Sequence, residues 1–224
     1  MQADESNLVL RAAKALQQAG KGQWGAALRL EKRIPMGAGL GGGSADAAAA
    51  LKGLNCFWGL HYSLDELCEI GVKLGADVPF CLHDAPRRAQ GIGEKLTEIP
   101  CKRTYPLVLV QPCRALSTRD VFQAYHQSTV EPADTKGVIA ALEMGDLDRM
   151  DACARNELET VSLAMLPQIQ EAKDALKALG AGMARMTGSG SVVFGAFEER
   201  AWAQKAYAQL KERYAGCILT ETAL

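Results

Sequence analysis

The sequence lacks the marks of secreted, membrane-spanning and metal-binding proteins. It has no run near the about 18 uninterrupted apolar residues of a membrane-spanning helix. Its first seven residues are polar and acidic, without the basic and then apolar profile of a signal peptide. The histidines His61, His83 and His126 are scattered, and none has another at the i, i+4 spacing of a helical metal-binding pair. We expect structural or surface roles for them, and the sequence identifies no metal ligands.

Closely spaced cysteines are absent as well. No two of the seven cysteines lie two to four positions apart, as they would in a structural zinc site. Their odd number and wide gaps argue against a disulfide framework. We expect reduced thiols in a cytoplasmic protein, mostly small core residues. They are Cys56, Cys68, Cys81, Cys101, Cys113, Cys153 and Cys217.

An excess of charge of one sign is also absent, because 25 Lys and Arg nearly balance 26 Asp and Glu. The net charge of -1 gives no general attraction to nucleic acid or an anionic membrane, so we expect small-molecule partners and leave the oligomeric state open. With 224 residues, 48% of them hydrophobic, the chain can form one large domain or two of roughly 100 to 150 residues each.

Local patterns predict mostly helices in the first half of the chain. Residues 6–19 form an amphipathic pattern that Ser6 or Asn7 can cap. Residues 27–31 alternate as a strand does, and the alanine-rich residues 44–54 favour a helix.

Residues 63–93 predict one further helix, followed by extended chain and a turn. Ser63 and Glu66 form a capping box for a helix over 64–74. Residues 78–82 are predicted to be extended, and 91–93 to form a turn or bulge between short strands.

After residue 100 the pattern changes to alternating strands and helices. Setting extra helices aside, the order is β-α-β-β-α-β, the split βαβ arrangement. We therefore predict an α+β protein with two domains, 1–100 and 101–224. The predicted strands are 107–110, 183–187, 191–197 and 217–221, and the predicted helices are 119–126, 136–143, 152–164, 168–179 and 199–213.

The strongest local signal is a glycine-dense loop that leads into the alanine-rich helix. Five of the seven residues 37–43 are glycine, which is costly in chain entropy for a mere connection. Glycines let the backbone approach a ligand, and a helix start offers unpaired N–H groups, so the loop is a candidate phosphate cradle. The candidate ATP-binding residues are Pro35, Met36, Gly37, Ala38, Gly39, Leu40, Gly41, Gly42, Gly43, Ser44 and Ala45.

Two better-known phosphate loops fit poorly. A P-loop would place Lys and then Ser or Thr after the last glycine, but Ser44 and Ala45 follow Gly43. A dinucleotide fingerprint would follow a hydrophobic strand and precede an acidic residue on a second strand, whereas Asp65 and Glu66 begin a capped helix.

Four segments in order resemble the GHMP kinases. They are the loop with its lead-in, 33–44, and the segments 74–80, 155–159 and 185–191. They are most similar to one branch, whose members phosphorylate the hydroxyl of a cytidine-diphosphate-linked alcohol in isoprenoid precursor synthesis. The resemblance covers essentially the whole chain. It implies ATP and Mg²⁺, with a ribosomal-protein-S5-like N-terminal domain, incomplete at its start, and a ferredoxin-like split βαβ C-terminal domain.

The resemblance also assigns roles to single residues. From the sequence alone Asp77 would be a turn residue; in the family, its counterpart is the base toward the acceptor hydroxyl. The family's third motif, beside the phosphate loop, corresponds to Thr187, Gly188, Ser189 and Gly190, which also read as a hairpin turn.

At the substrate end, the resemblance assigns cytidine contacts to Thr118, which we expect to cap a helix, and Phe122. Core packing is the alternative role for Phe122. Arg155 and Asn156 carry no decisive chemistry, and we expect structural roles for them.

The family's first motif, with a lysine and an asparagine that face the substrate and the transferring phosphate, has no counterpart in the sequence. We therefore expect weak ATP binding and almost no kinase activity, unless Lys32 or Arg185 supplies the positive charge. Another GHMP kinase, of homoserine or mevalonate type, and a catalytically silent nucleotide-binding remnant remain as alternatives.

Overall fold

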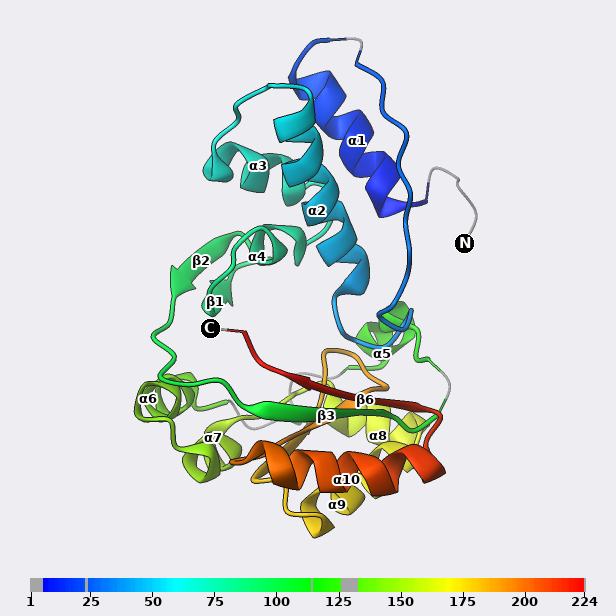
Figure 1. The fold of residues 1–224 in the computed structure, drawn as a ribbon, viewed down its shortest axis with the longest axis vertical. Helices are drawn as coiled ribbons and strands as arrows, with labels where there is room; N and C mark the ends of the chain where they lie inside the picture. The colour runs from blue at the N-terminus through cyan, green and yellow to red at the C-terminus, as the bar shows by residue number, and fades with distance from the viewer. Residues whose placement is uncertain (1–5, 23, 114, 126–132, 224) are drawn as a thin grey trace. The chain divides into compact units, whose positions relative to one another are not determined.

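The computed structural model describes residues 6–22, 24–113, 115–125 and 133–223 (Figure 1). His126 therefore lies outside the described residues. The chain divides into two compact units, Met1–Pro35 with Gly41–Ile99, and Met36–Leu40 with Pro100–Leu224. The glycine loop thus contributes residues to both units, which the sequence patterns did not indicate.

Helices dominate the first unit. They are α1 (Leu8–Ala19), α2 (Gly42–Phe57), α3 (Leu64–Gly71) and α4 (Val78–Cys81). Helices α1 and α2 lie side by side (Figure 1) and share a core that includes Leu16 and Leu51, both fully buried. The predicted caps are present: Asn7 accepts a hydrogen bond from the N–H of Val9, and Ser63 forms the capping box of α3.

Two predictions in this unit are wrong. Residues 78–82 are not extended, because Pro79 lies in the first turn of α4, where its fixed φ favours a helix. Residues 27–31 form no strand, because no neighbouring strand pairs with them within the described part of the chain.

A hairpin completes the first unit. Strands β1 (Arg87–Gln90) and β2 (Lys95–Glu98) pair antiparallel around the predicted turn. Gly93, with φ +109°, lies so close to the chain before α4 that a Cβ would stand 2.4 Å from the carbonyl oxygen of Ala76. The hairpin turn therefore supports the short connection that carries Asp77.

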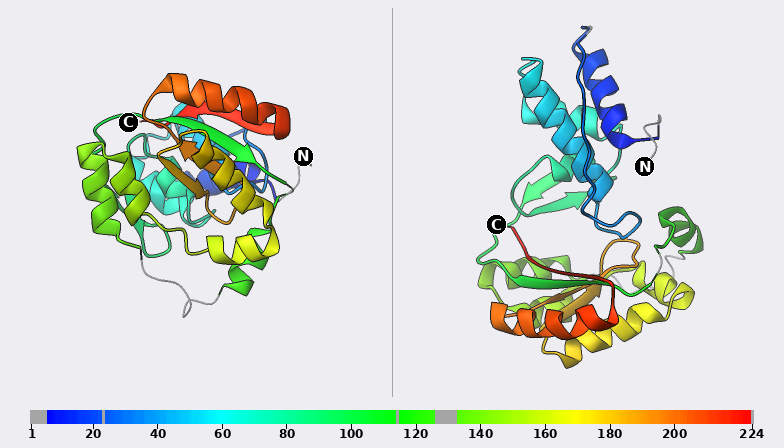
Figure 2. Two further views of the ribbon diagram at one scale, coloured as in Figure 1. Left: turned by 90° about the horizontal axis from the view of Figure 1, so that it is seen from below. Right: turned by 45° about the vertical axis from the view of Figure 1, so that its right-hand side comes forward.

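The second unit is a four-stranded antiparallel sheet with helices. Its strand order is β4-β5-β3-β6, and helices α9 and α10 cover one face (Figure 2). This is the predicted split βαβ arrangement. The strands are β3 (Pro106–Gln111), β4 (Met183–Met186), β5 (Val193–Ala196) and β6 (Gly216–Glu221). The helices are α5 (Thr118–Ala124), α6 (Thr135–Met144), α7 (Leu147–Cys153), α8 (Glu159–Met165), α9 (Gln168–Ala178) and α10 (Arg200–Arg213).

The prediction of one continuous helix over 152–164 is wrong. Helix α7 ends at Cys153, α8 begins at Glu159, and the chain between them is not helical. Asn156 lies in this break, and its amide side chain bonds to the backbone at Met186 and Gly188.

The cysteines are thiols, and none of the described helices is long and apolar enough to cross a bilayer.

Candidate active site

The first part of the glycine loop is anchored inside the second unit. The carbonyl oxygen of Ala38, a buried residue, accepts hydrogen bonds from the Thr187 hydroxyl at 3.1 Å and from the Val192 N–H at 3.3 Å. Gly37 and Gly39 have φ of +65° and +73°, which side-chain-bearing residues rarely adopt. The structure thus places the loop against the turn predicted as the third motif.

The contact between loop and turn is backbone against backbone. A Cβ on Gly39 would stand 2.1 Å from the Thr187 carbonyl oxygen, and one on Gly188 would stand 3.0 Å from the Gly39 carbonyl oxygen. Glycine at both positions is what lets the two segments approach this closely.

The turn is held by Asn156. Its side-chain amide donates to the carbonyl of Met186 at 2.9 Å and to the carbonyl of Gly188 at 2.8 Å. One side chain therefore fixes the backbone on both sides of Thr187. The sequence placed Asn156 inside a helix predicted over 152–164 and gave it no decisive chemistry; the resemblance over 155–159 was the only sign that drew attention to it.

Further polar groups complete this support. The buried Ser162 hydroxyl donates to the Ser189 carbonyl at 3.2 Å. The hydroxyls of Ser189 and Thr118 share a hydrogen bond of 2.9 Å. Glu159 accepts from the N–H of Met186 at 2.9 Å. Neither Ser162 nor Glu159 was expected from the sequence, because their partners lie far away in the chain.

The second part of the loop begins α2 in the first unit. Gly41 stands at the N-cap with φ +63° and no side-chain cap, and a Cβ built on it would meet nothing within 4 Å. Gly41 is therefore glycine for its backbone conformation and not for packing. The first N–H groups of α2, from Gly42 onward, have no partner within the helix and can bind an anion.

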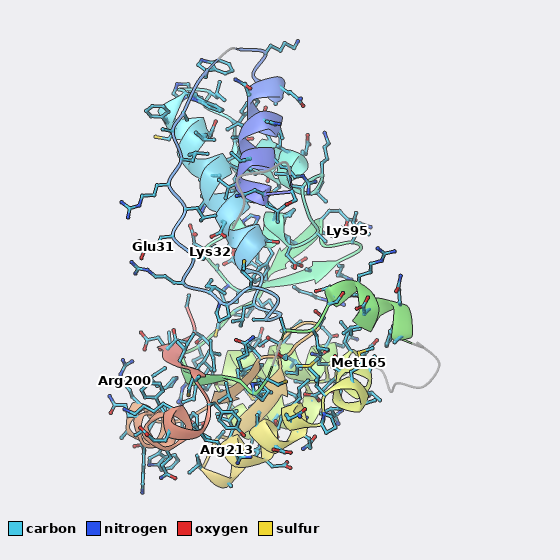
Figure 3. The ribbon with its side chains drawn as sticks, turned by 90° about the vertical axis from the view of Figure 1, so that its right-hand side faces the viewer. Glu31, Lys32, Lys95, Met165, Arg200 and Arg213 are labelled. Atoms are coloured by element: carbon cyan, nitrogen blue, oxygen red, sulfur yellow. The ribbon has the colours of Figure 1, made fainter. Side chains whose placement is uncertain are left out.

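Charged and hydroxyl groups surround this helix start. The Lys32 ammonium forms an ion pair with Asp46 on α2, and the neighbouring Glu31 points away (Figure 3). A Cβ on Gly75 would stand 4.0 Å from the Ser44 hydroxyl, so Ser44 faces the connection that leads to Asp77.

Asp77 has no structural task. It occupies the N-cap position of α4, yet its side chain makes no capping hydrogen bond. It is exposed, and among the described residues its carboxylate has neither a hydrogen-bond partner nor an ion-pair partner. A capping or turn-stabilising aspartate would show such a bond, so the carboxylate is available for chemistry.

The proposed cytidine contacts both belong to α5. The prediction that Thr118 caps this helix is wrong: Ser117 is the cap and accepts from the N–H of Asp120, while Thr118 begins the helix and bonds to Ser189. Phe122 is 59% exposed and is not a core residue.

Two family models match the chain. The GHMP kinases N terminal domain matches residues 7–85, and the GHMP kinases C terminal domain matches residues 138–216. The chain belongs to the GHMP kinases.

Two similar relatives carry the same name. The chain is 39% identical to 4-diphosphocytidyl-2-C-methyl-D-erythritol kinase of Listeria monocytogenes serotype 4a over 208 residues, which is 93% of this chain and 72% of that protein. For the enzyme of the same name in Enterococcus faecalis, the identity is 41% over 93% of this chain and 74% of that protein.

Solved structures of GHMP kinases superpose on this chain. A crystal structure of 4-(cytidine 5'-diphospho)-2C-methyl-D-erythritol kinase superposes with a TM-score of 0.85 at 31% identity, covering 100% of this chain and 81% of that one. Homoserine kinase from Cytophaga hutchinsonii superposes with a TM-score of 0.84 at 19% identity, covering 100% of this chain and 78% of that one, which shows a shared fold alone.

Proposed function

We propose that this chain transfers the terminal phosphoryl group of ATP to the free hydroxyl of 4-diphosphocytidyl-2-C-methyl-D-erythritol, a step toward isoprenoid precursors. The observation that carries this proposal is the identity of 39% to a kinase of that name over 93% of the chain. The anchored glycine loop and the unpaired Asp77 supply the chemistry that such a kinase needs.

The triphosphate binds to the loop of residues 37–43 through backbone N–H groups. The left-handed conformations of Gly37, Gly39 and Gly41 turn the chain into the start of α2. Because Gly41 has open space where a side chain would be, a phosphate can approach its backbone closely.

Asp77 acts as the base. Its carboxylate accepts a hydrogen bond from the substrate hydroxyl and takes the proton as the hydroxyl oxygen bonds to the terminal phosphorus and ADP leaves. Among the described residues it has no hydrogen-bond or ion-pair partner, which leaves both carboxylate oxygens available for this hydrogen bond.

The Ser44 hydroxyl would contact a Mg²⁺ ion bound with the nucleotide, and such an ion would supply positive charge against the charge that develops on the phosphates. No group of three or more His, Cys, Asp and Glu side chains suited to a metal occurs among the described residues.

The cytosine ring stacks on Phe122, whose exposed ring is free to meet a base, and Thr118 lies one helical turn before it. The reaction takes place in the cytoplasm, which the reduced thiols support.

The test is a coupled assay of ADP release with ATP, Mg²⁺ and a panel of alcohols, namely 4-diphosphocytidyl-2-C-methyl-D-erythritol, homoserine and mevalonate, with ATP binding measured by calorimetry. We expect the cytidine alcohol to be the preferred acceptor, with a turnover that is weak without the family's first motif and is lost in Asp77→Asn. Preference for another alcohol would contradict the assigned substrate. ATP binding without any turnover would indicate a silent nucleotide-binding protein.

A further inference from the structure

Helix α5, which contains Thr118 and Phe122, is too short to be stable by itself. It has 7 residues, fewer than an isolated helix needs in water, and it lies beside α8 (Figure 2). Of its described side chains only Val121 is buried, and this side chain packs into the core of the second unit. One buried side chain leaves a helix free to turn or slide unless other contacts hold it.

The residues that attach α5 lie on one side of it. Their spacing of i, i+3, i+4 and i+7 forms a single stripe along the helix, made by Thr118, Val121, Phe122 and Tyr125. Within this stripe Val121 is buried, whereas the ring of Phe122 is 59% exposed. The exposed ring therefore stands at the edge of the face by which the helix is attached.

Both ends of the stripe are tied to the second unit by hydrogen bonds. At its beginning, the hydroxyls of Thr118 and Ser189 share a hydrogen bond of 2.9 Å. At its end, the Tyr125 hydroxyl donates a hydrogen bond to the Glu157 carboxylate. This bond to Glu157 raises the pKa of the Tyr125 hydroxyl, so the hydroxyl keeps the proton that it donates. Phe122 thus lies between two tethers.

The two tethers end on the same support. Ser189 belongs to the turn of residues 187–190, which contacts the glycine loop. Glu157 is the neighbour of Asn156 in the chain. The Asn156 amide donates to the carbonyls of Met186 and Gly188, and so holds the same turn. The exposed ring of α5 is therefore fixed to the structure that anchors the glycine loop.

We propose that Tyr125 and Glu157 are positioning residues for the cytosine end of the substrate. Their hydrogen bond holds α5 so that the Phe122 ring is in place before the base arrives, and neither residue touches the substrate itself. A ring that is fixed in advance binds more tightly, because binding then orders fewer groups. This inference rests on the proposed function, which assigns the cytosine ring to Phe122.

The test measures by calorimetry the binding of 4-diphosphocytidyl-2-C-methyl-D-erythritol without ATP, so that no turnover occurs, and the binding of ATP in a separate titration. Tyr125→Phe removes the donor of the tether. Tyr207→Phe, which removes a half-buried tyrosine's hydroxyl from α10, is the matched control. Glu157→Leu removes the acceptor, whereas Glu157→Gln keeps an oxygen that can accept. Hydrogen exchange of the α5 amides follows the helix without any ligand.

We expect Tyr125→Phe and Glu157→Leu each to weaken binding of the cytidine alcohol by about three- to tenfold and to leave ATP binding unchanged. General damage to the second unit would weaken the binding of both ligands. Glu157→Gln and Tyr207→Phe should bind both ligands nearly as the parent does. The α5 amides should exchange faster in Tyr125→Phe than in the parent or in Tyr207→Phe.

Removing the ring decides whether the tether acts through it. Phe122→Ala should weaken binding of the cytidine alcohol by about 5- to 150-fold, and adding Tyr125→Phe should cause no further loss, because no ring is left to position. A further loss in the double variant would overturn the inference, and so would α5 exchange or alcohol binding that Tyr125→Phe leaves unchanged. A parent chain that does not bind the cytidine alcohol would overturn the proposed function as well.

Discussion

A matched pair of substitutions, Gly39→Ala and Gly41→Ala, measures how strongly the glycine loop is packed on the Thr187 turn. Both residues have positive φ, +73° and +63°, so both variants bear a similar conformational cost of about 1 kcal/mol once the stiffer unfolded chain is counted. Only Gly39 has an obstacle: its new Cβ would lie 2.1 Å from the Thr187 carbonyl oxygen, whereas that of Gly41 would meet nothing within 4 Å.

The obstacle at Gly39 is backbone, so no side chain can move aside. Relief requires the turn to shift, which strains or breaks the Thr187–Ala38 hydrogen bond. Overpacking of this kind costs about 1 to 3 kcal/mol, and the lost hydrogen bond adds about 1 kcal/mol. We expect Gly39→Ala to be destabilised by about 3 to 5 kcal/mol and Gly41→Ala by about 1 kcal/mol.

Urea and thermal unfolding followed by circular dichroism measure the difference. At about 2 to 4 °C per kcal/mol for a chain of this size, Gly39→Ala should melt about 4 to 16 °C below Gly41→Ala. Equal melting temperatures for the two variants would refute the claim that the loop and the turn are in backbone contact.

Four further predictions follow from the site and the core. Gly41→Val should abolish ATP binding in calorimetry while the circular dichroism spectrum stays unchanged; binding as tight as the parent's would exclude the loop as the phosphate cradle. In a version of the chain that also carries the family's first motif, Asp77→Asn should lower kcat by a factor on the order of 10² to 10⁴ with little change in KM for ATP, and an unchanged kcat would leave Asp77 as a turn residue. Asn156→Ala leaves two carbonyls without their donor and should cost about 1 to 3 kcal/mol in urea unfolding, a loss that an exposed Gln170→Ala control should not show. Burial raises the pKa of the Cys217 thiol from 9.0 to about 11, so the unfolded chain releases this proton first; the contribution to stability is complete below pH 9 and is lost as pH rises toward 11. Cys217→Ala should flatten the fall in stability between pH 9 and 11, and an unchanged slope would contradict this.

Local chemistry made much of the fold predictable. The caps at Asn7 and Ser63 need only neighbouring residues, so their helices could be located from the sequence. A strand differs, because its hydrogen bonds come from another segment. Residues 27–31 alternate correctly and still form no sheet, since no partner strand lies beside them in the described part of the chain.

In the candidate site too, features set by neighbouring residues could be predicted, and features set by distant segments could not. The glycine loop was visible because its composition is unusual within a few residues. Asn156, Ser162 and Glu159 were not, since each supports the turn through a partner 27 to 32 residues away in the chain. No pattern near any of these three residues reports such a distant partner.

The hydrogen bond between Thr187 and Ala38 also sets an order of events. It joins residues 149 positions apart, so during synthesis the loop emerges long before the turn that fixes it. Until then residues 36–40 have no anchor, and closing so long a loop costs entropy that only the finished second unit can offset. Contacts of such wide separation slow folding. A ribosome that stopped before residue 187 would release a chain whose helix α2 can form, but whose glycine loop still has no fixed shape to offer a phosphate.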